Sequence, residues 1–529
     1  MRRLRENFSE KTNHLSSLSL TEWQWVLCFL IAALLLWGIA LGNLPLRDWD
    51  EGTRALVARE IYQTGNWLYP TFQGKPYLLK PPLMDWLIAC SYQLGGVTEF
   101  TTRLPGAFFS ACGVPLLYLV AREVFLERLP AIFSAGVYLT LLPVVRHGRL
   151  AMLDGMVVTF FLLLLICLLK SRRNAYWAVG IGLCLGLITF TKGLLVVPLA
   201  TIALSFIIAD KQLKILKNRY FWLGLIIGNL PIIAWYAAQW QHYGTTFLQV
   251  HFQNQGLERI SQAVEGHNQP AWFYLLELIK YTLPWLLFWF GGLYLAWQKR
   301  ATSWGALTLI GTVGYLGVIS LMKTKLPWYI MPLYPFFAIA VAAQLAEFWK
   351  NSKHLPRFLT IILGFLVLVG LVGLLYFVLA DPQPVLMVMS VVVALTMGLS
   401  SWLANKNNPK FIIVLLVGMY LVLGLLMTSK SWIWELNEAF PVKPVANLIR
   451  ERTNTNAVIY ISFGYRRPSL DFYSERQVIP SDTNTLKKIW SQQSYFLLNQ
   501  QTLSALNLPG SVALGTAEGF TLLTHKSPI

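Results

Sequence analysis

The sequence is poor in charged residues. Asp, Glu, Lys and Arg make up 13% of its 529 residues, against roughly 25% in an ordinary soluble domain, and 55% of the residues are hydrophobic. So small a charged fraction excludes a water-exposed surface over most of the chain. Many apolar runs approach or exceed the roughly 20 residues that a helix needs to cross about 30 Å of hydrocarbon. We therefore expect an all-α polytopic membrane bundle.

Acidic residues are scarcer than basic ones. The chain has 25 Asp and Glu against 43 Lys and Arg, which gives a net charge of +18. In a soluble protein this excess would favour a nucleic-acid partner. Here the basic residues fall in short gaps between apolar runs, such as KSRRN (170–174) and DKQLKILKNR (210–219). Such clusters mark cytoplasmic loops of membrane proteins, so we expect no nucleic-acid partner.

Several common site motifs are also missing. The five cysteines all lie in apolar segments without the spacing of metal ligands, as buried small hydrophobic residues do. No P-loop is present, and the glycines of GIGLCLG (180–186) lie in an apolar helix with no strand before them, which favours close helix packing over a dinucleotide site. The first apolar run has no small-residue cleavage site after it, which predicts a retained span.

What is present is a series of about thirteen apolar spans. With a cytoplasmic N-terminus, this number places every basic cluster on the cytoplasmic side, whereas a further span at Pro81–Gly96 would place KSRRN outside, against the charge rule. The predicted spans are residues 23–44, 103–121, 130–145, 155–169, 176–191, 193–209, 221–240, 272–297, 304–322, 328–348, 358–380, 384–404 and 411–428.

This topology divides the chain into four parts. Residues 1–22 form a cytoplasmic N-terminus, and residues 23–428 form the transmembrane domain. Within this domain, residues 45–102 form a long first external loop with interfacial helices at Gly52–Thr64 and Leu83–Leu94. Residues 429–529 form an extracytoplasmic C-terminal domain. We expect a multi-pass protein of the plasma (inner) membrane.

The C-terminal part differs in composition, with shorter apolar stretches and more polar residues. Four stretches predict strands: AVIYISFG (457–464), LDFYS (470–474), SYFLLNQ (494–500) and SVALGTAEGFTLLTH (511–525). KPVANLIRERT (443–453) and TNTLKKIWSQQ (483–493) predict helices. The result is a small external α/β domain, and it carries no nucleophile motif, metal cluster or phosphate loop.

The first external loop concentrates charge in RDWDEGTRALVARE (47–60). Asp48 and Arg59 are explained by helix capping and local pairing. Asp50 is not, because a second carboxylate beside Glu51 needs a compensating cation, metal or substrate. Ionisable groups at membrane depth indicate function, so Asp50 and Glu51 are candidate site residues.

Further polar residues lie on the same predicted face. In GKPYLLKPP (74–82), two prolines stiffen the backbone next to Lys80, and lysine suits phosphate oxygens. The other candidates are Asp154 in RLAMLD, Lys192 in FTKG, Arg259 and His267 in loop 241–271, and Lys325 and Tyr329 in KTKLPWYIMPLYP. Helix capping, snorkelling to headgroups and aromatic anchoring are the alternatives for these residues.

Together these loops offer carboxylates and cations at one water–membrane boundary. A lipid-linked phosphate requires that arrangement, with its phosphate against Lys and Arg and its tail along apolar helix surface. His and Glu in loop 241–271 suit a divalent metal, but their spacing matches no tight ligand pattern. No cofactor is therefore assigned, and a divalent metal is left open.

The stretch DEGTRALVAREIYQTGNWLYPTFQGKPYLLKPPLMDWL (50–87), with RLAMLD, FTKG and KTKLPWYIMPLYP in the same order, resembles the membrane-embedded C-type glycosyltransferases. The resemblance is to the branch of protein O-mannosyltransferases and lipid A aminoarabinose transferases. It implies transfer of a sugar, with inversion, from a polyprenyl-phosphate donor to an acceptor hydroxyl of a lipid, glycan or protein outside the cytoplasm.

The resemblance also implies residue roles. Asp50 matches the first-loop aspartate that acts on the acceptor, and Asp154 matches the acidic residue of the second external loop. Lys80 matches the lysine that holds the donor phosphate, with Arg259 and Lys325 as weaker phosphate candidates. Aminoarabinose transferases commonly carry Glu before that lysine, where this chain has Leu79. This difference leaves a metal ligand and the aminoarabinose specificity without support.

A transporter or flippase for a lipid-linked or anionic solute is the alternative function. Transporters often show internal repeats and interrupted helices near the midplane of the membrane. This sequence has no convincing repeat, and its charges lie at one face. A receptor or scaffold is favoured by the C-terminal domain alone.

Overall fold

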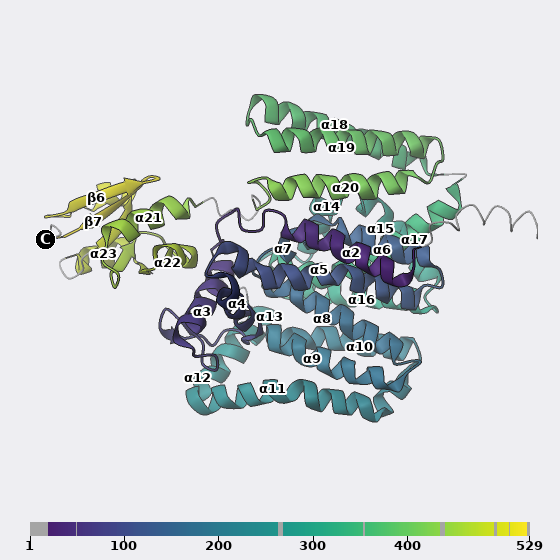
Figure 1. Cartoon of the computed structure of the whole chain (residues 1–529), viewed down its shortest axis with the longest axis horizontal. Helices are drawn as coiled ribbons and strands as arrows, with labels where there is room; N and C mark the ends of the chain where they lie inside the picture. The colour runs from purple at the N-terminus through teal and green to yellow at the C-terminus, as the bar shows by residue number, and fades with distance from the viewer. Residues whose placement is uncertain are drawn as a thin grey trace, which may run out of the picture.

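The computed structural model describes residues 20–525 except residues 49, 263–267, 353–354, 434–439, 491–494 and 507. Figure 1 shows long helices lying side by side in one bundle, with a small domain of strands and short helices projecting from one end. Helices α3 and α4 lie at this end, between the bundle and the small domain. The predicted class, a helical membrane bundle with a small C-terminal α/β domain, is confirmed.

The helices of the bundle follow the predicted apolar runs. They are α2 (Glu22–Gly38), α5 (Glu99–Val124), α6 (Arg128–Leu139), α7 (Leu142–Gly148), α8 (Leu153–Lys170), α9 (Ala178–Lys192), α10 (Val196–Ala209), α11 (Arg219–Tyr243), α14 (Phe273–Tyr281), α15 (Leu286–Gln298), α16 (Ser303–Leu321), α17 (Tyr334–Lys350), α18 (Arg357–Leu379), α19 (Pro384–Asn405) and α20 (Phe411–Thr428). Short 3-10 turns precede several of them: η2 (Ala175–Trp177), η3 (Gly193–Leu195), η4 (Leu213–Lys217) and η7 (Pro327–Leu333).

The predicted number of spans is not confirmed. Among the described residues, 9 helices are long and apolar enough to cross a membrane, or 10 if the bent pair α6 and α7 is one span. Part of the difference is residues 175–209, which count once as 35 helical residues. Their two ends nevertheless meet, because Arg172 pairs with Asp210 at 2.6 Å and Asn218 donates to the carbonyl of Ala175 at 3.0 Å. The chain turns back at Gly193, whose φ is +55°.

The outer helices carry apolar side chains on their exposed surfaces. Figure 1 shows α18 and α19 as a hairpin at the edge of the bundle. Exposed large hydrophobic residues on this hairpin include Ile361, Phe365, Leu368, Val372, Leu375, Val388, Leu395 and Leu399. Such a surface is stable against lipid and not against water, so the chain is a multi-pass membrane protein.

The end of the bundle opposite the small domain gathers the basic clusters. Arg173 pairs with Glu123, and Lys350 pairs with Glu127 at 2.6 Å. Glu22 receives both Arg122 and Arg128. In the described part of the chain, clusters that the charge rule assigned to one side of the membrane thus share one end of the bundle.

Glycines let two helices of the bundle approach closely. A Cβ atom on Gly182 of α9 would lie 2.1 Å from the backbone nitrogen of Leu225 in α11. A Cβ on Gly186 would lie 2.1 Å from the carbonyl oxygen of Gly228. Only glycine fits such a contact. The prediction that GIGLCLG packs helices in the membrane is therefore confirmed.

The first loop contains the two helices that the sequence predicts. They are α3 (Asp50–Thr64) and α4 (Leu83–Gly95), joined through a short hairpin of β1 (Thr71–Phe72) and β2 (Lys75–Pro76). A buried ion pair connects them, because Arg54 of α3 meets Asp85 of α4 at 2.7 Å. The second large loop of the bundle holds α12 (Thr245–Leu248), the π-helix η5 (Gln249–Leu257) and α13 (Glu258–Ser261).

The C-terminal domain contains one five-stranded mixed sheet in the order β4-β3-β5-β7-β6. Its elements are α21 (Val442–Arg452), β3 (Val458–Ile461), α22 (Pro468–Ser474), β4 (Gln477–Pro480), α23 (Thr483–Ile489), β5 (Tyr495–Asn499), α24 (Gln500–Ala505), β6 (Val512–Ala517) and β7 (Phe520–Thr524). The predicted strand LDFYS is wrong: it lies in α22, which Pro468 begins and Glu475, with φ +55°, ends. Its apolar residues are too few to distinguish a single helical turn from a strand.

Candidate active site

Asp50 lies in the first turn of α3. Its side chain is exposed, whereas Asp48 and Glu51 are buried. Among the described residues, no hydrogen bond or ion pair engages the Asp50 carboxylate. Of these three carboxylates, Asp50 alone is thus positioned to meet a molecule from outside the chain.

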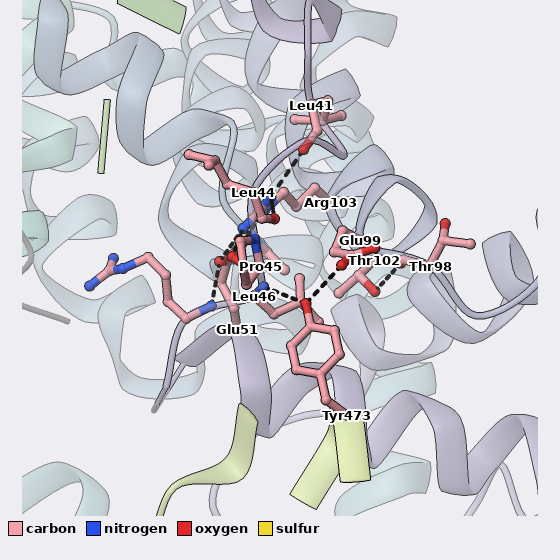
Figure 2. A network of polar contacts seen from close by, with 12 residues as sticks. Leu41, Leu44, Pro45, Leu46, Glu51, Thr98, Glu99, Thr102, Arg103 and Tyr473 are labelled. Atoms are coloured by element: carbon pink, nitrogen blue, oxygen red, sulfur yellow. Dashed lines mark hydrogen bonds and ion pairs between the residues drawn. The ribbon is translucent and has the colours of Figure 1, made fainter. Parts of the chain in front are cut away.

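Glu51 is held inside the protein by four donors. Figure 2 shows its carboxylate facing Arg103 of α5, whose Nε and Nη2 donate to Oε1 and Oε2 at 2.8 Å each. The backbone nitrogens of Arg47 and Ala151 complete its hydrogen bonds at 3.0 Å. Burial opposes ionisation of Glu51, but Arg103 and these backbone donors lower its pKa below the usual range. The carboxylate is therefore ionised and fully engaged, and we do not include Glu51 among the proposed substrate contacts.

Arg103 extends this network into the loop before α3. Its Nη1 donates to the carbonyls of Leu41 and Leu44 at 3.0 and 2.8 Å, and its Nη2 donates to the carbonyl of Pro45 at 2.8 Å (Figure 2). A single buried guanidinium thus fixes the chain that leads from α2 to Asp50. Arg103 was not predicted as a site residue, because 52 residues separate it from Glu51 in the sequence.

Lys80 lies on a loop that is fastened from two sides. On one side, Arg54 donates to the hydroxyl of Tyr77 and to Asp85. On the other, Nδ1 of buried His251 donates to the carbonyl of Leu78 at 3.1 Å. Contacts at Tyr77, Leu78 and Asp85 thus fix the chain on both sides of Lys80.

The tautomer of His251 follows from its partners. Because a carbonyl only accepts, Nδ1 carries the proton, and Nε2 accepts from the hydroxyl of Tyr236 at 2.9 Å. Burial, with a smaller contribution from the Lys80 charge, lowers the pKa of His251 to about 4, although the hydrogen bond to Leu78 acts in the opposite direction. The imidazole is neutral at physiological pH, and its hydrogen bond to Leu78 connects η5 to the Lys80 loop.

Lys80 is surrounded by other cations. Burial, followed by the positive charges of Arg259, Lys192 and Arg54, lowers its pKa to about 7, and the charge of Asp50 acts in the opposite direction. These groups come from α3, the Lys80 loop, α9 and α13. Concentrated positive charge that lowers a lysine pKa is a feature of sites that bind anions.

Asp154 and Lys192 meet at the ends of α8 and α9. Their Oδ1 and Nζ atoms lie 2.6 Å apart, with side chains 4% and 13% exposed. The carboxyl group of Asp154 also interacts electrostatically with Asp50 and Lys80. Both predicted residues thus belong to one cluster, and Asp154 balances part of its positive charge.

Tyr329 joins this pair to Arg259. The Lys192 ammonium lies 5.2 Å from the centre of the Tyr329 ring, and Arg259 Nη1 donates to the Tyr329 hydroxyl at 2.9 Å. The backbone of Arg259 accepts from Thr324 N at 3.2 Å, which ties α13 to the segment before η7. Six predicted residues are therefore brought together, here called the site cluster: Asp50, Lys80, Asp154, Lys192, Arg259 and Tyr329.

Sequence comparisons identify relatives with one kind of activity. The family model described as dolichyl-phosphate-mannose-protein mannosyltransferase matches residues 79–236. Undecaprenyl phosphate-alpha-4-amino-4-deoxy-L-arabinose arabinosyl transferase 1 of Pseudomonas fluorescens is 27% identical over 474 residues, 85% of each chain. The transferase of the same name from Aeromonas hydrophila is 30% identical over 352 residues, 64% of this chain and 62% of that enzyme.

Structural comparison supports the same assignment of fold. ArnT from Cupriavidus metallidurans bound to undecaprenyl phosphate matches with a TM-score of 0.78 and 18% identity, over 95% of this chain and 98% of that one. The chain is similar in sequence to these transferases and has the fold of ArnT. It is an enzyme that transfers a sugar, and the transporter alternative is not supported.

Two predicted residues of this glycosyltransferase are not placed in the site cluster. Lys325 is buried, and its ammonium group donates to the carbonyl of Met322. That bond anchors the segment before η7, so we do not include Lys325 in the proposed phosphate site. His267 lies outside the described residues.

A metal site finds no support in the part of the glycosyltransferase that the structure describes. There, no group of three or more His, Cys, Asp and Glu side chains is arranged to hold an ion. Leu79, at the position before Lys80, offers no ligand. The arrangement instead offers one exposed carboxylate facing several fixed cations, which is suited to transfer from an anionic leaving group.

Proposed function

We propose that this glycosyltransferase transfers a sugar from a polyprenyl-phosphate donor to an acceptor hydroxyl of a lipid, glycan or protein, with inversion at the sugar carbon. The observation that carries the proposal is the site cluster. In it, the exposed Asp50 carboxylate, which has no bonded partner among the described residues, lies within electrostatic reach of Lys80, and Lys80 lies within reach of Arg259 and Lys192. The relatives named above carry the activity of undecaprenyl-phosphate-dependent transferases in their names. Undecaprenyl phosphate is therefore the first donor carrier to test.

Each residue of the cluster has a role in this reaction. Lys80 and Arg259 bind the donor phosphate, and Tyr329 holds Arg259 in place. As the bond between the sugar carbon and the phosphate oxygen breaks, negative charge grows on the phosphate, and fixed cations stabilise it more than water does. The polyprenyl phosphate leaves with that electron pair.

The acceptor is activated on the opposite face of the sugar. Asp50 accepts the proton of the acceptor hydroxyl while the acceptor oxygen forms its bond to the sugar carbon. Asp154 keeps Lys192 beside the phosphate through their 2.6 Å ion pair. Attack from the face opposite the leaving phosphate gives inversion.

The proposal includes an orientation in the membrane. Residues 1–22 are cytoplasmic, residues 23–428 form the transmembrane domain, and residues 429–529 lie outside the cytoplasm. The site cluster, in and beside the loop 45–102, faces the same side as the C-terminal domain. Basic clusters at the opposite end of the bundle support this orientation through the charge rule.

The direct test is a product assay on the purified chain in detergent or lipid. Labelled undecaprenyl-phosphate sugars, with an extract of the host's own lipids and glycans as acceptor, should yield free undecaprenyl phosphate and a labelled acceptor. Asp50→Asn serves as the inactive control. Movement of intact donor across a vesicle membrane without release of undecaprenyl phosphate would overturn the proposal.

A further inference from the structure

The C-terminal domain contacts the bundle at the turn of α3 that carries Asp50. Two residues before Asp50, the buried carboxylate of Asp48 accepts from Arg467 Nη1 at 2.6 Å. Its other oxygen accepts from the backbone nitrogen of Ser469 at 3.1 Å and from the Ser469 hydroxyl. All donors to Asp48 in the described structure are thus supplied by the small domain, from the first turn of α22.

Arg467 is itself rigidly held. Its Nη2 donates to the hydroxyl of Tyr465 at 2.5 Å, and its guanidinium lies 4.2 Å from the ring centre of Phe440 and 4.5 Å from that of Phe463. A guanidinium stacked among aromatic rings keeps its fork in one orientation. The position of Asp48 is therefore set by the core of the C-terminal domain.

The backbones of the two domains also touch beside Asp50. A Cβ atom on Gly52 would lie 2.7 Å from the backbone nitrogen of Ser469 and 3.0 Å from the Cβ of Pro468. Glycine at this position allows α22 to rest directly against α3. A methyl group there would separate the two helices.

Further contacts surround the same turn. Figure 2 shows Tyr473 of α22 pointing toward the loop before α3, where its hydroxyl accepts from Leu46 N at 2.7 Å and donates to Glu99 at 3.0 Å. Glu99 also pairs with Lys443 of α21 at 2.6 Å, and Arg59 donates to the carbonyl of Phe472 at 2.7 Å. These contacts form one docking surface between the C-terminal domain and the bundle, which extends along α3 from its first turn, at Gly52, to its middle, at Arg59.

We infer that Arg467 and Ser469 of the C-terminal domain are positioning residues that hold the Asp50 carboxylate in its orientation toward the acceptor. The backbone around Asp50 is fixed on one side by the bundle, through Glu51 and Arg103, and on the other by this domain, through Asp48. The Asp50 carboxylate has no hydrogen-bond partner of its own in the described structure, so its direction depends on the backbone. The inference rests on the proposed function, in which Asp50 is the base.

A positioning role makes a different prediction from a purely structural one. Displacing Asp50 slows the chemical step, because misplacement of a reacting group by about 1 Å costs up to about 100-fold. It leaves donor binding intact, because Lys80 and Arg259 are held by contacts that do not involve α22. Loss of folded protein would instead reduce donor binding and turnover together.

The experiment compares three full-length variants with the wild type. Arg467→Gln and Ser469→Ala remove donors to Asp48, and Arg450→Gln is the matched control, an exposed residue of the same domain that contacts Asn447. For each protein, kcat is measured with the labelled donor, and the Kd for undecaprenyl phosphate is measured separately. We expect kcat to fall about 10-fold or more in Arg467→Gln and less in Ser469→Ala, with Kd within about twofold of wild type.

A second pair of variants approaches the same interface from α3. Gly52→Ala should lower kcat as Arg467→Gln does, while Gly38→Ala, whose added Cβ meets nothing within 4 Å, should not. Unchanged kcat in folded Arg467→Gln and Gly52→Ala would overturn the inference, as would an equal loss in Arg450→Gln. Failure of the wild type to release undecaprenyl phosphate would overturn the proposed function instead.

Discussion

Asp48 and Glu51 are buried, and each accepts hydrogen bonds from a buried arginine of another element. Asp50 lies between them in the same turn and is exposed, with no partner among the described residues. A buried carboxylate is stable only when its hydrogen bonds and charge are balanced. The first two therefore belong to the scaffold, and their rigid bonds leave the third free to act on a ligand.

The cations show the same division. Arg103 and Arg467 each face a carboxylate and are committed to it. Lys80, in contrast, lies near other cations, and burial together with these charges lowers its pKa to about 7. Repulsion between neighbouring cations raises the free energy of the empty site, and a bound anion lowers it. The difference separates the residues that build the site from those that bind the substrate.

The largest expected effect is that of Asp50→Asn. An amide of the same size cannot accept the acceptor proton, so we expect turnover to fall about 100- to 10,000-fold. Because Asp50 has no bonded partner in the described structure, the melting temperature should stay near that of wild type. Sugar transfer and thermal unfolding in detergent measure both quantities, and near-normal turnover would remove Asp50 from the mechanism.

Glu51→Gln should instead lower the stability of the protein. It leaves Arg103 buried without its counter-charge, which costs about 3–5 kcal/mol for a buried pair. The free energy of unfolding, or the melting temperature, should fall clearly. The control is Glu127→Gln, at an exposed pair with Lys350, where about 0–1 kcal/mol is expected. Equal stability of the two variants would contradict the scaffold role of Glu51.

Asp471→Asn tests the docking surface through pH. The buried Asp471 carboxyl accepts from Val478 N and Gln73, yet burial raises its pKa to about 7. Because this lies above the unfolded value near 4, its stabilising contribution is present at low pH and is lost as pH rises through 7. Wild type should therefore lose about 2 kcal/mol between pH 5 and pH 8 that the variant does not lose.

The comparison between the two proteins is needed because Lys80 and Asp85 also have pKa values shifted into this range, to about 7 and about 6. Thermal unfolding at several pH values gives both curves. Parallel curves for wild type and Asp471→Asn would show that Asp471 does not titrate in this interval.

The smallest predicted effect is on the pH dependence of donor binding. Lys80 binds phosphate as a cation, so the affinity for undecaprenyl phosphate should weaken about tenfold from pH 7 to pH 9, as Lys80 loses its proton. In Lys80→Arg the guanidinium stays charged, and the affinity should change little with pH. An equal pH dependence in both proteins would assign the titration to another group.

Local sequence patterns predicted most of the fold. Apolar runs gave the helices of the bundle, and the charge rule separated basic loops from the face that carries Asp50 and Lys80. The failures are short or distant features. LDFYS is a single helical turn rather than a strand, and the strand Gln477–Pro480 was not predicted because its four residues carry little pattern.

Local patterns also predicted part of the candidate site. Asp50, Lys80, Asp154 and Lys192 stand out as charges beside apolar runs, which is a local signal. Arg103 and Arg467 do not, because their partners Glu51 and Asp48 are 52 and 419 residues away. The docked α22 could not be foreseen, since no single-sequence pattern records which loop a distant domain contacts.

The central claim is that the cations of the site cluster hold a lipid phosphate while Asp50 acts on the acceptor. Its most direct test is the Kd for undecaprenyl phosphate of wild type, Lys80→Ala and Asp50→Asn at pH 7. We predict about 10- to 100-fold weaker binding for Lys80→Ala, as expected for loss of a charged contact, and no weakening for Asp50→Asn. Wild-type affinity in Lys80→Ala, with the protein folded, would contradict the account.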